Sequence, residues 1–502
     1  MSPLLVGIFL LIIGYKLYEF LNSTPKNIPP SLPRLPVIGS YWHLLWHNYT
    51  HPFKTVLYYA HKLRSSIVTC YLGNTVTIIA SDYSSVKDIL TREEFDGRLM
   101  NLTTTLSAGY GKPLGIFFIE GPVWQEQRRF MLRHMRDFGF GRRHEKYEAN
   151  MLEEMSILVN MLKDGPINDK EKEYLKNGYA LFPDVLYPCV TNSIWDIFFG
   201  ERFNRSEHDQ VRYLCKAVML LQKSGDITGG AIAQFSFLKH FGNMFKYRDF
   251  SKSNHEIFDF IKKHIEKQRH FTEDDMGLVS RYLKEIEGTK DATSSFTMEQ
   301  LVVLLGDLML PSLSVMPSVI VHAIKCAMHN PKVVKNVQNE IDRVVGTGRL
   351  ITWEDRKNLT YTEATVRETL RYETVTPFGV FHKALKDTTL SGFDVPKDAA
   401  VVTNLTGLNN DPDLWGDPEN FRPERFLNEK GELGKDYTFP FGLGHRVCAG
   451  ETFARYIVFQ TFATLMQNFD FSFVKGEPTG LDDKIIGSMV IPEHTWIRIE
   501  PR

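Results

Sequence analysis

The chain has 502 residues, 43% of them hydrophobic and 12% aromatic, which is enough to build an extensive core. Its 59 basic and 60 acidic residues nearly cancel, so the overall charge excludes the basic surplus typical of nucleic-acid-binding proteins. The five cysteines lie far apart without a CxxC pair, which argues against a disulfide framework and a structural zinc site. We therefore expect a globular protein whose folded part faces a reducing compartment.

Residues 1–22 form an apolar segment interrupted only by Lys16 and Glu19. A membrane-spanning helix needs about 20 such residues. No basic region precedes the segment and no A-x-A cleavage site follows it, which favours a retained membrane anchor over a cleaved signal peptide. The basic residues Lys26 and Arg34 follow it, so the positive-inside rule places the main body in the cytosol.

Residues 23–40 contain five prolines and one glycine, a density that prevents a helix and predicts a stiff extended linker. Residues 41–502 contain no second linker and no repeat, and helical periodicity dominates them. We expect one large domain that is mainly α-helical with small β-sheets.

Shorter segments predict individual elements of this domain. Residues 66–80 and 400–404 are rich in β-branched residues and are expected to form strands. Asn330 and Pro331 provide an N-cap and a proline at the first helical position. Apolar residues then recur at helical spacing until Gly346 ends the predicted helix.

The segment Phe441-Gly442-Leu443-Gly444-His445-Arg446-Val447-Cys448-Ala449-Gly450 has the chemistry of a cofactor site. Its glycines allow a tight turn and close approach to a flat group, and its arginine can reach a carboxylate. An apolar helix face follows, so Cys448 is expected just before a helix N-terminus, where N–H groups and the helix dipole stabilise a thiolate. The other four cysteines are expected to be small buried hydrophobes.

This motif resembles the haem-binding signature of the cytochrome P-450 family, and the resemblance extends from the anchor to Arg502. It implies the cytochrome P-450 fold and haem b as the cofactor. It also implies that Cys448 is the axial thiolate ligand of the iron, whose electron donation promotes cleavage of the O–O bond. Phe441 and Arg446 are expected to contact the same cofactor.

Further segments match the family in the same order. Glu368-Thr369-Leu370-Arg371 resembles the ExxR motif, and with Arg425 of the segment Phe421–Phe426 it looks like the family's Glu-Arg-Arg triad, whose implied role is structural. Trp124 and Arg128 resemble the WxxxR helix, and their spacing places both side chains on one helix face.

The resemblance implies that Trp124 and Arg128 face a haem propionate, and that His382 and Arg446 contact propionates as well. Many relatives have proline before this histidine, whereas this chain has Phe381. Because of this difference, His382 matches the family's histidine position less closely.

The chain departs from the family in the long distal helix, where the pattern Ala/Gly-Gly-x-Asp/Glu-Thr reads Pro311-Ser312-Leu313-Ser314-Val315. In the family, that acid and that alcohol help to deliver protons, and valine cannot do so. Pro311 and Pro317 each remove a helical hydrogen bond, so we expect a kink in the helix.

Three interpretations of this departure remain open. In the first, Ser312 or Ser314, with water held by a carbonyl that a proline frees, replaces the missing catalytic pair. In the second, oxygen activation is lost and the protein is a reductase-independent isomerase or dehydratase acting on a peroxide. In the third, the protein binds a haem ligand without turnover.

The resemblance favours a monooxygenase that hydroxylates or epoxidises a lipophilic substrate with O2 and NADPH-derived electrons. Its implied partners are NADPH-cytochrome P-450 reductase, cytochrome b5 as a further electron donor, and membrane lipid, with no nucleic acid. The implied location is the endoplasmic reticulum membrane with the haem domain on the cytosolic side. The expected pocket segments are mostly apolar and are 114–118, 219–221, 310–315, 375–380 and 486–490.

Overall fold

The computed structural model describes residues 3–22, 25–48, 51–100, 110–138, 145–228, 230–268, 277–289 and 293–502. The chain divides into two compact units, which are treated separately below. Unit 1 consists of Met1–Leu99, Phe378–Leu408 and Leu443–Arg446. Unit 2 consists of Met100–Pro377, Asn409–Gly442 and Val447–Arg502.

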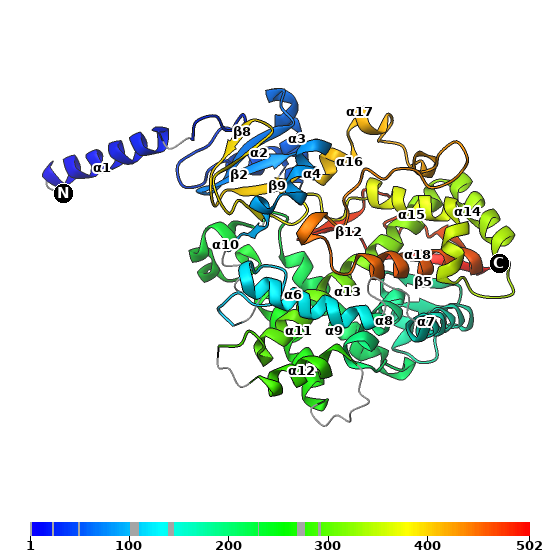
Figure 1. The fold of residues 1–502 in the computed structure, drawn as a ribbon. Coiled ribbons are helices and arrows are strands. Elements are labelled where there is room, and N and C mark those ends of the chain that lie inside the picture. Colours follow the sequence, from blue (N-terminus) through cyan, green and yellow to red (C-terminus); the bar gives the residue numbers. More distant parts are fainter. Residues whose placement is uncertain are drawn as a thin grey trace. The chain divides into compact units, whose positions relative to one another are not determined.

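Helices dominate the chain and the sheets are small, so the expected fold class is confirmed (Figure 1). The helices of unit 1 are α1 (Pro3–Asn22), α2 (Tyr41–Asn48), α3 (Pro52–Leu63), α4 (Tyr83–Thr91) and, at its boundary, α16 (Leu405–Asn409). The helices of unit 2 are α6 (Gly121–Met135), α7 (Glu145–Asp164), α8 (Tyr187–Phe199), α9 (His208–Ser224), α10 (Gly230–Gln234), α11 (Tyr247–Lys267), α12 (Leu278–Gly288), α13 (Met298–His329), α14 (Pro331–Val344), α15 (Thr360–Tyr372), α17 (Pro412–Trp415) and α18 (Glu451–Asn468).

A five-stranded sheet organises unit 1 in the order β1-β2-β9-β6-β3. Its strands are β1 (Ile67–Leu72), β2 (Thr75–Ala80), β9 (Ala400–Thr403), β6 (His382–Lys383) and β3 (Gly97–Arg98). The predicted strands at 66–80 and 400–404 are therefore confirmed. The pair β3 and β6 is antiparallel and sets Arg98 opposite His382. A separate hairpin joins β7 (Thr388–Leu390) to β8 (Phe393–Val395).

The proline-rich segment lies along this sheet from residue 30 onward. Leu32 N–H donates to the Thr69 carbonyl, and Thr69 N–H donates to the Pro30 carbonyl, both at 2.9 Å. No helix forms between residues 25 and 40, as the prolines predict. The domain boundaries at 22 and 40 stay a prediction.

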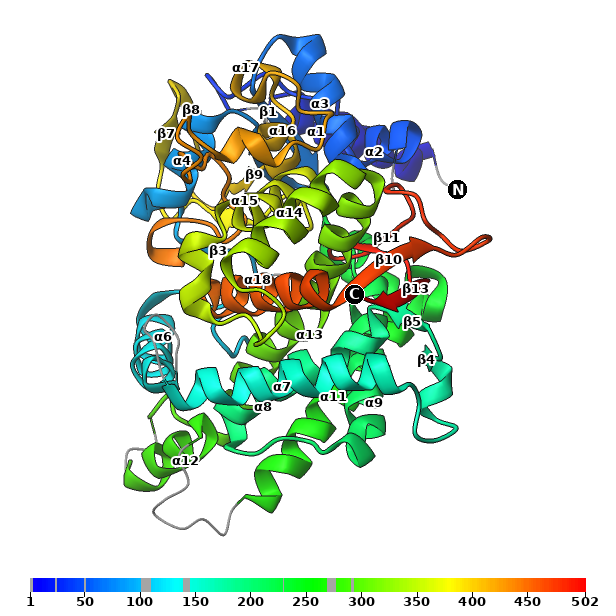
Figure 2. The same cartoon turned by 90° about the vertical axis from the view of Figure 1, so that its right-hand side faces the viewer.

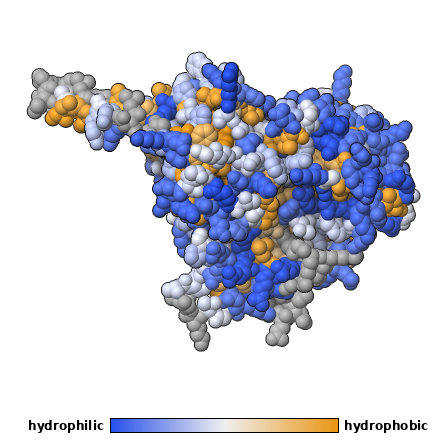
Figure 3. All heavy atoms as spheres, turned by 45° about the horizontal axis from the view of Figure 1, so that its top comes forward, coloured by the Kyte–Doolittle hydropathy of each residue, from blue (hydrophilic) through white to orange (hydrophobic). Residues whose placement is uncertain are grey.

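Residues 3–22 form the helix α1, whose apolar side chains include several that are exposed. Leu11 is 74% exposed, and Ile8 and Ile12 are about half exposed. Figure 3 shows hydrophobic residues on the surface of the molecule, this helix included. Arg34 holds the C-terminal end of α1 by donating to the Phe20 carbonyl at 2.8 Å. A helix with such a surface fits a membrane anchor, and that role stays a prediction.

Helix α13 is the central helix of unit 2. Among the described residues it is the helix that is long and apolar enough to cross a membrane, but 67% of its most apolar window is buried. It packs against α8, α18 and α15, and its apolar residues belong to the main core of the unit. Thr297 caps its first turn by accepting the Gln300 N–H at 3.1 Å. We therefore read α13 as a core helix.

The helix α13 continues through both prolines without interruption from Met298 to His329. The expected kink stays a prediction, whereas the prolines do not end the helix. After α13, Asn330 occupies the N-cap position of α14 and is followed by Pro331, as predicted, and the Asn330 carbonyl accepts the Val333 N–H at 2.7 Å. The Asn330 side chain donates backward to the Cys326 carbonyl at 2.8 Å and caps α13, and it makes no capping bond to α14. The predicted helix itself is confirmed as α14.

Two small sheets complete unit 2 (Figure 2). The first has the order β10-β13-β5-β4, formed by β10 (Phe469–Phe473), β13 (Thr495–Pro501), β5 (Tyr179–Phe182) and β4 (Leu175–Lys176). The second is the hairpin of β11 (Lys484–Ile486) and β12 (Val490–Pro492).

Candidate functional site

Cys448 lies in a loop directly before α18, as the sequence predicts. Its N–H donates to the Phe441 carbonyl at 2.8 Å, which closes the loop. The Phe441 ring is covered by the guanidinium of Arg455, whose Cζ lies 4.7 Å from the ring centroid. Cys448 is exposed, whereas the other four cysteines are buried as expected. The loop thus presents one accessible thiol.

The expectation of a stabilised thiolate needs a correction for the protein alone. Desolvation by the surrounding chain raises the pKa of the Cys448 thiol above its usual value. The Gly450 N–H and the charge of Arg128 act in the opposite direction, and Glu451 adds to the rise. The Gly450 N–H at the start of the helix therefore favours the thiolate as predicted, whereas desolvation by the chain opposes it.

Trp124 and Arg128 lie on one face of α6, one helical turn apart. The Arg128 guanidinium lies 5.6 Å from the Trp124 ring centroid. Its Nη2 donates to the Val447 carbonyl at 2.5 Å, one residue before Cys448. The structure thus brings the WxxxR pair to the cysteine loop. Contact with a propionate stays a prediction.

In unit 1, a second set of basic groups surrounds the turn at Phe95 and Asp96. Arg446 Nε donates to the Asp96 carbonyl at 2.9 Å. His382 is 3% exposed, and its Nδ1 lies 2.7 Å from the Phe95 carbonyl. Since that carbonyl only accepts, Nδ1 carries the proton and Nε2 presents a lone pair in the neutral ring.

The pKa of His382 is lowered to about 3, chiefly by burial and then by the charges of Arg98 and Arg446. In the protein alone His382 is therefore neutral at physiological pH, and Arg98 and Arg446 supply the positive charge of this set. A bound anion would oppose this lowering, because it would stabilise the charged imidazolium.

Sequence reasoning missed Arg98, which is 5% exposed and paired in register with His382. A buried arginine beside two other predicted anion contacts belongs with them by position and charge. In the sequence Arg98 is a basic residue in a short extended segment. Such residues are too common for this pattern to identify Arg98 as part of a site.

The predicted Glu-Arg-Arg triad is present and deeply buried in unit 2. Arg371 donates from Nε and Nη2 to the two oxygens of Glu368, both at 2.8 Å, and Arg425 Nε donates to Glu368 at 3.0 Å. Glu368 and Arg371 side chains are fully buried and that of Arg425 is 4% exposed. Arg371 also donates to the Asn409 carbonyl at 2.8 Å. These bonds tie α15 to the segment that contains Arg425.

On α13 the two candidate serines donate to their own helix. Ser312 Oγ bonds the Leu308 carbonyl and Ser314 Oγ bonds the Leu310 carbonyl, both at 2.7 Å. Both serines are buried. The partly exposed residues in this stretch are Asp307, Leu308, Leu310, Pro311 and Val315, and Asp307 is the one among them with a titratable side chain. A catalytic role for either serine stays a prediction.

Asp307 joins α13 to the loop at residues 115–117. Its Oδ2 accepts the N–H groups of Ile116 at 2.7 Å and Phe117 at 2.9 Å. Gln300 pairs with Gly115 by donating to its carbonyl at 2.8 Å and accepting its N–H at 2.9 Å. Burial raises the pKa of Asp307 to about 7, against the effect of the two backbone N–H groups. Gly115 is required here, because a Cβ would lie 2.1 Å from the Asp307 carboxylate.

Several segments predicted to line a pocket make direct contacts within unit 2. Val490 N–H donates to the Val375 carbonyl at 2.8 Å. At the end of α9, Gln222 Nε2 donates to the Met489 carbonyl at 2.6 Å, and Ser488 N–H donates to the Gln222 carbonyl at 2.9 Å. Their role as pocket walls stays a prediction.

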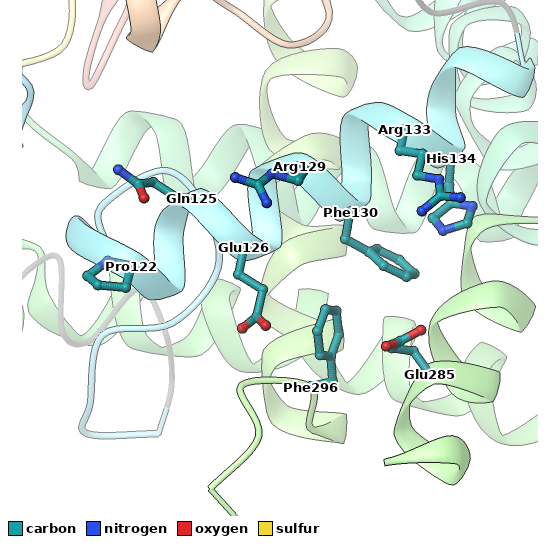
Figure 4. A pocket seen from close by; sticks show the side chains of 9 residues that line it. All are labelled: Pro122, Gln125, Glu126, Arg129, Phe130, Arg133, His134, Glu285 and Phe296. Atoms are coloured by element: carbon teal, nitrogen blue, oxygen red, sulfur yellow. The ribbon is translucent and has the colours of Figure 1, made fainter. Parts of the chain in front are cut away.

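A surface pocket of about 450 Å³ lies beside α6 (Figure 4). Phe130 and Phe296 line it and pack edge to face with ring centroids 5.1 Å apart. Its α6 residues lie on the helix face opposite Trp124 and Arg128, as helical spacing requires. This pocket is therefore separate from the candidate site.

The family description Cytochrome P450 matches residues 29–495. Farnesoate epoxidase of Bombyx mori is 27% identical over 481 residues, which cover 94% of each chain. Cytochrome P450 2B2 of Rattus norvegicus is 30% identical over 483 residues, again 94% of each chain. Cytochrome P450 2J3 of Rattus norvegicus is 31% identical over 469 residues, which cover 91% of this chain and 88% of that protein.

Proposed function

The chain belongs to the cytochrome P450 family, and from that premise we propose that it is a haem-thiolate monooxygenase that hydroxylates or epoxidises a neutral lipophilic molecule. The family is one of monooxygenases that bind haem b through a cysteine thiolate. The observation that carries the proposal is the accessible Cys448 thiol, held in a closed loop beside Arg128.

The residues present fit this cofactor. Four of the five cysteines are buried, and Cys448 alone offers an accessible sulfur to a metal. Haem b carries two propionates, and the candidate contacts Arg128, Arg98 and Arg446 are permanently charged donors suited to carboxylates. Trp124 is 8% exposed and can contribute an indole N–H next to Arg128.

When bound, the haem supplies the activation of dioxygen. The chain's own residues set its surroundings. Cys448 holds the iron, and the cationic groups bind and orient the propionates. His382 can donate to a propionate only from Nε2, which requires that the anion raise its pKa, because Nδ1 donates to the Phe95 carbonyl. The triad around Glu368 fixes α15 and thereby keeps the loop scaffold in place.

The substrate class follows from the expected pocket segments, which are mostly apolar and contain no basic residue. The carboxylate of Asp307 lies beside one of these segments, so a substrate anion would meet repulsion without a compensating cation. We therefore propose a neutral lipophilic substrate. One of the relatives is named farnesoate epoxidase, so epoxidation of an isoprenoid lipid is one reaction within the proposed range.

We further propose that α1 anchors the protein in the endoplasmic reticulum membrane with the remaining chain in the cytosol. The exposed apolar side chains of α1 and the basic residues that follow it support this orientation. The electron donor is NADPH-cytochrome P450 reductase, with cytochrome b5 as a further donor. The exposed Arg129 and Arg133 of α6 offer charges suited to an acidic partner surface.

A second candidate, rearrangement of a lipid peroxide without reductase, is favoured by one observation. At the family's acid and threonine positions α13 carries Ser314, which is buried and donates to the Leu310 carbonyl, and Val315, which has no donor group, and peroxide rearrangement consumes no external protons or electrons. The experiment incubates purified haem-loaded protein with neutral lipids, reductase, NADPH and oxygen, and in parallel with lipid hydroperoxides alone. Product only in the first reaction supports the monooxygenase. Product only in the second reaction overturns it.

A further inference from the structure

A line of polar residues runs along one face of the mainly apolar helix α13. It consists of Gln300, Asp307, Ser314, Ser318, His322 and Lys325, which we call the α13 polar face. Successive members are separated by seven, seven, four, four and three residues, each close to a whole number of helical turns. Pro311 and Val315 lie on the same face by the same spacing. The polar face therefore passes the partly exposed part of α13.

A buried cluster of titratable groups forms the C-terminal end of this face. His322 Nδ1 lies 3.6 Å from a carboxylate oxygen of Glu373, and both side chains are 2–3% exposed. Lys484 Nζ lies 2.7 Å from the same oxygen, and its side chain is 21% exposed. These three residues therefore connect the interior of α13 with the solvent-exposed side of β11.

Two atoms of this cluster have no partner among the described residues. They are His322 Nε2 and Glu373 Oε1, and both are buried. Buried polar atoms of this kind normally bind protein groups or ordered water, so the pair marks a place for a water that can exchange protons. Burial raises the pKa of Glu373 and lowers the pKa of His322, so it favours the neutral form of both groups.

The polar face continues from this cluster toward the accessible part of α13. Ser318 lies one turn before His322, and its hydroxyl donates to the Ser314 carbonyl at 2.6 Å. Ser314 lies one further turn along, next to Val315, and the distance along the helix from His322 to Ser314 is about 12 Å. Ser312 lies off this face, so the geometry favours Ser314 over Ser312 as its last hydroxyl.

Resting on the proposed monooxygenase function, we propose that His322, Glu373 and Lys484 form a proton-supplying cluster that serves the pocket face of α13 through Ser318 and Ser314. Monooxygenation of one substrate molecule takes two electrons from the reductase and two protons, and one oxygen atom leaves as water. Glu373 takes up a proton on the Lys484 side and passes one to His322. The imidazole releases a proton from its other nitrogen through water to Ser318, so no residue changes its charge over a cycle.

Several other charged or titratable groups face this cluster and set its pH response. They are Lys325 and Cys326 on α13, Tyr372 at the end of α15, and Asp482 and Asp483 before β11. Lys325 is 1% exposed and donates to the Pro478 carbonyl at 3.1 Å. Burial raises the pKa of Glu373, and Lys484 and Lys325 both oppose that rise.

The test uses the haem-loaded full chain with reductase and compares Glu373→Gln, His322→Phe and Ser318→Ala with the wild type. The matched control is His264→Phe on α11, because His264 is also buried and its Nδ1 bonds the Phe260 carbonyl at 2.9 Å. The first readout is how the electrons of NADPH divide between oxidised organic product and hydrogen peroxide. The same division is measured in heavy water to obtain the solvent isotope effect. We expect at least about a tenfold loss of product per NADPH for Glu373→Gln and His322→Phe, and no change for the control.

The second readout does not depend on turnover. It follows the infrared band of the protonated Glu373 carboxyl, identified by its loss in Glu373→Gln, during a pH titration. We expect His322→Phe to shift the midpoint, and His264→Phe to leave it in place. If the wild type is active and the variants form as much product per NADPH as the wild type, the proposed proton-supplying cluster is wrong, whereas the proposed function stands. A wild type without any NADPH-dependent product overturns the proposed function instead, while the infrared titration still decides whether His322 and Glu373 exchange protons.

Discussion

Replacing Asp307 with asparagine measures how much the ionised form of one buried carboxyl group lowers the free energy of unfolding. Both backbone N–H groups that bind this side chain donate to the same oxygen, Oδ2, so an asparagine can accept both with its amide oxygen. The substitution therefore keeps the hydrogen bonds to Ile116 and Phe117 and removes the ionisable group. Any difference in stability between the two proteins then reports on the charge.

The magnitude follows from the pKa of Asp307, which burial raises from 3.8 to about 7. The folded protein holds a proton that the unfolded chain has already released, so stability falls as the pH rises from about 4 to about 7. The full shift corresponds to about 4 kcal/mol, and because Asp307 is partly accessible we expect about 2 kcal/mol to be realised.

The assay measures the free energy of unfolding in denaturant for both proteins between pH 4.5 and pH 8.5. Asp307→Asn is expected to be closest in stability to the wild type at the lower limit and to be more stable by about 2 kcal/mol above pH 7. Hydrogen exchange at residues 115–117 provides the local check, since Asp307→Val removes the acceptor and should speed exchange there. Equal pH slopes for the wild type and Asp307→Asn would refute the reasoning.

Three further predictions concern the site and its scaffold. Cys448→Ser is expected to abolish activity and the thiolate signature in the carbon monoxide difference spectrum, and a retained signature would contradict thiolate ligation by this residue. Glu368→Gln leaves two arginines buried without a carboxylate and should cost about 3–5 kcal/mol of unfolding free energy, whereas the exposed Glu354→Gln should cost under about 1 kcal/mol. Gly444→Ala should destabilise more than Gly431→Ala in thermal unfolding. Both glycines have positive φ, but of the two only Gly444 would place a Cβ against a backbone carbonyl oxygen, at 2.4 Å. Equal losses of thermal stability in the two variants would mean that the positive φ alone causes the effect.

Sequence patterns predicted helices and strands correctly where the type and spacing of a few neighbouring residues decide the secondary structure. The strands of residues 66–80 and the helix after Pro331 follow from side-chain type and spacing over a few residues. Asn330 occupies the predicted N-cap position of α14, but the direction of its side chain was not predictable, because the same asparagine ends one helix and precedes the next. Only the packed structure decides which of the two free ends receives the side chain.

The triad around Glu368 was predictable for a different reason. Glu368 and Arg371 share a helix face by spacing alone, and the resemblance supplied Arg425 as the third member. Arg98 was not predictable in this way, because its place beside His382 depends on the register of β3 and β6. That register joins residues far apart in the sequence.

The sequence by itself determined the family, the cysteine that offers the iron a ligand, and the loss of the usual acid and alcohol on α13, because each is a matter of residue type at fixed spacing. Only the tertiary structure decided the protonation chemistry. Burial explains the neutral state of His382 and the raised pKa of Asp307. Contacts between distant parts of the chain bring His322 together with Glu373 and Lys484. Burial and long-range contacts cannot be predicted from the spacing of neighbouring residues.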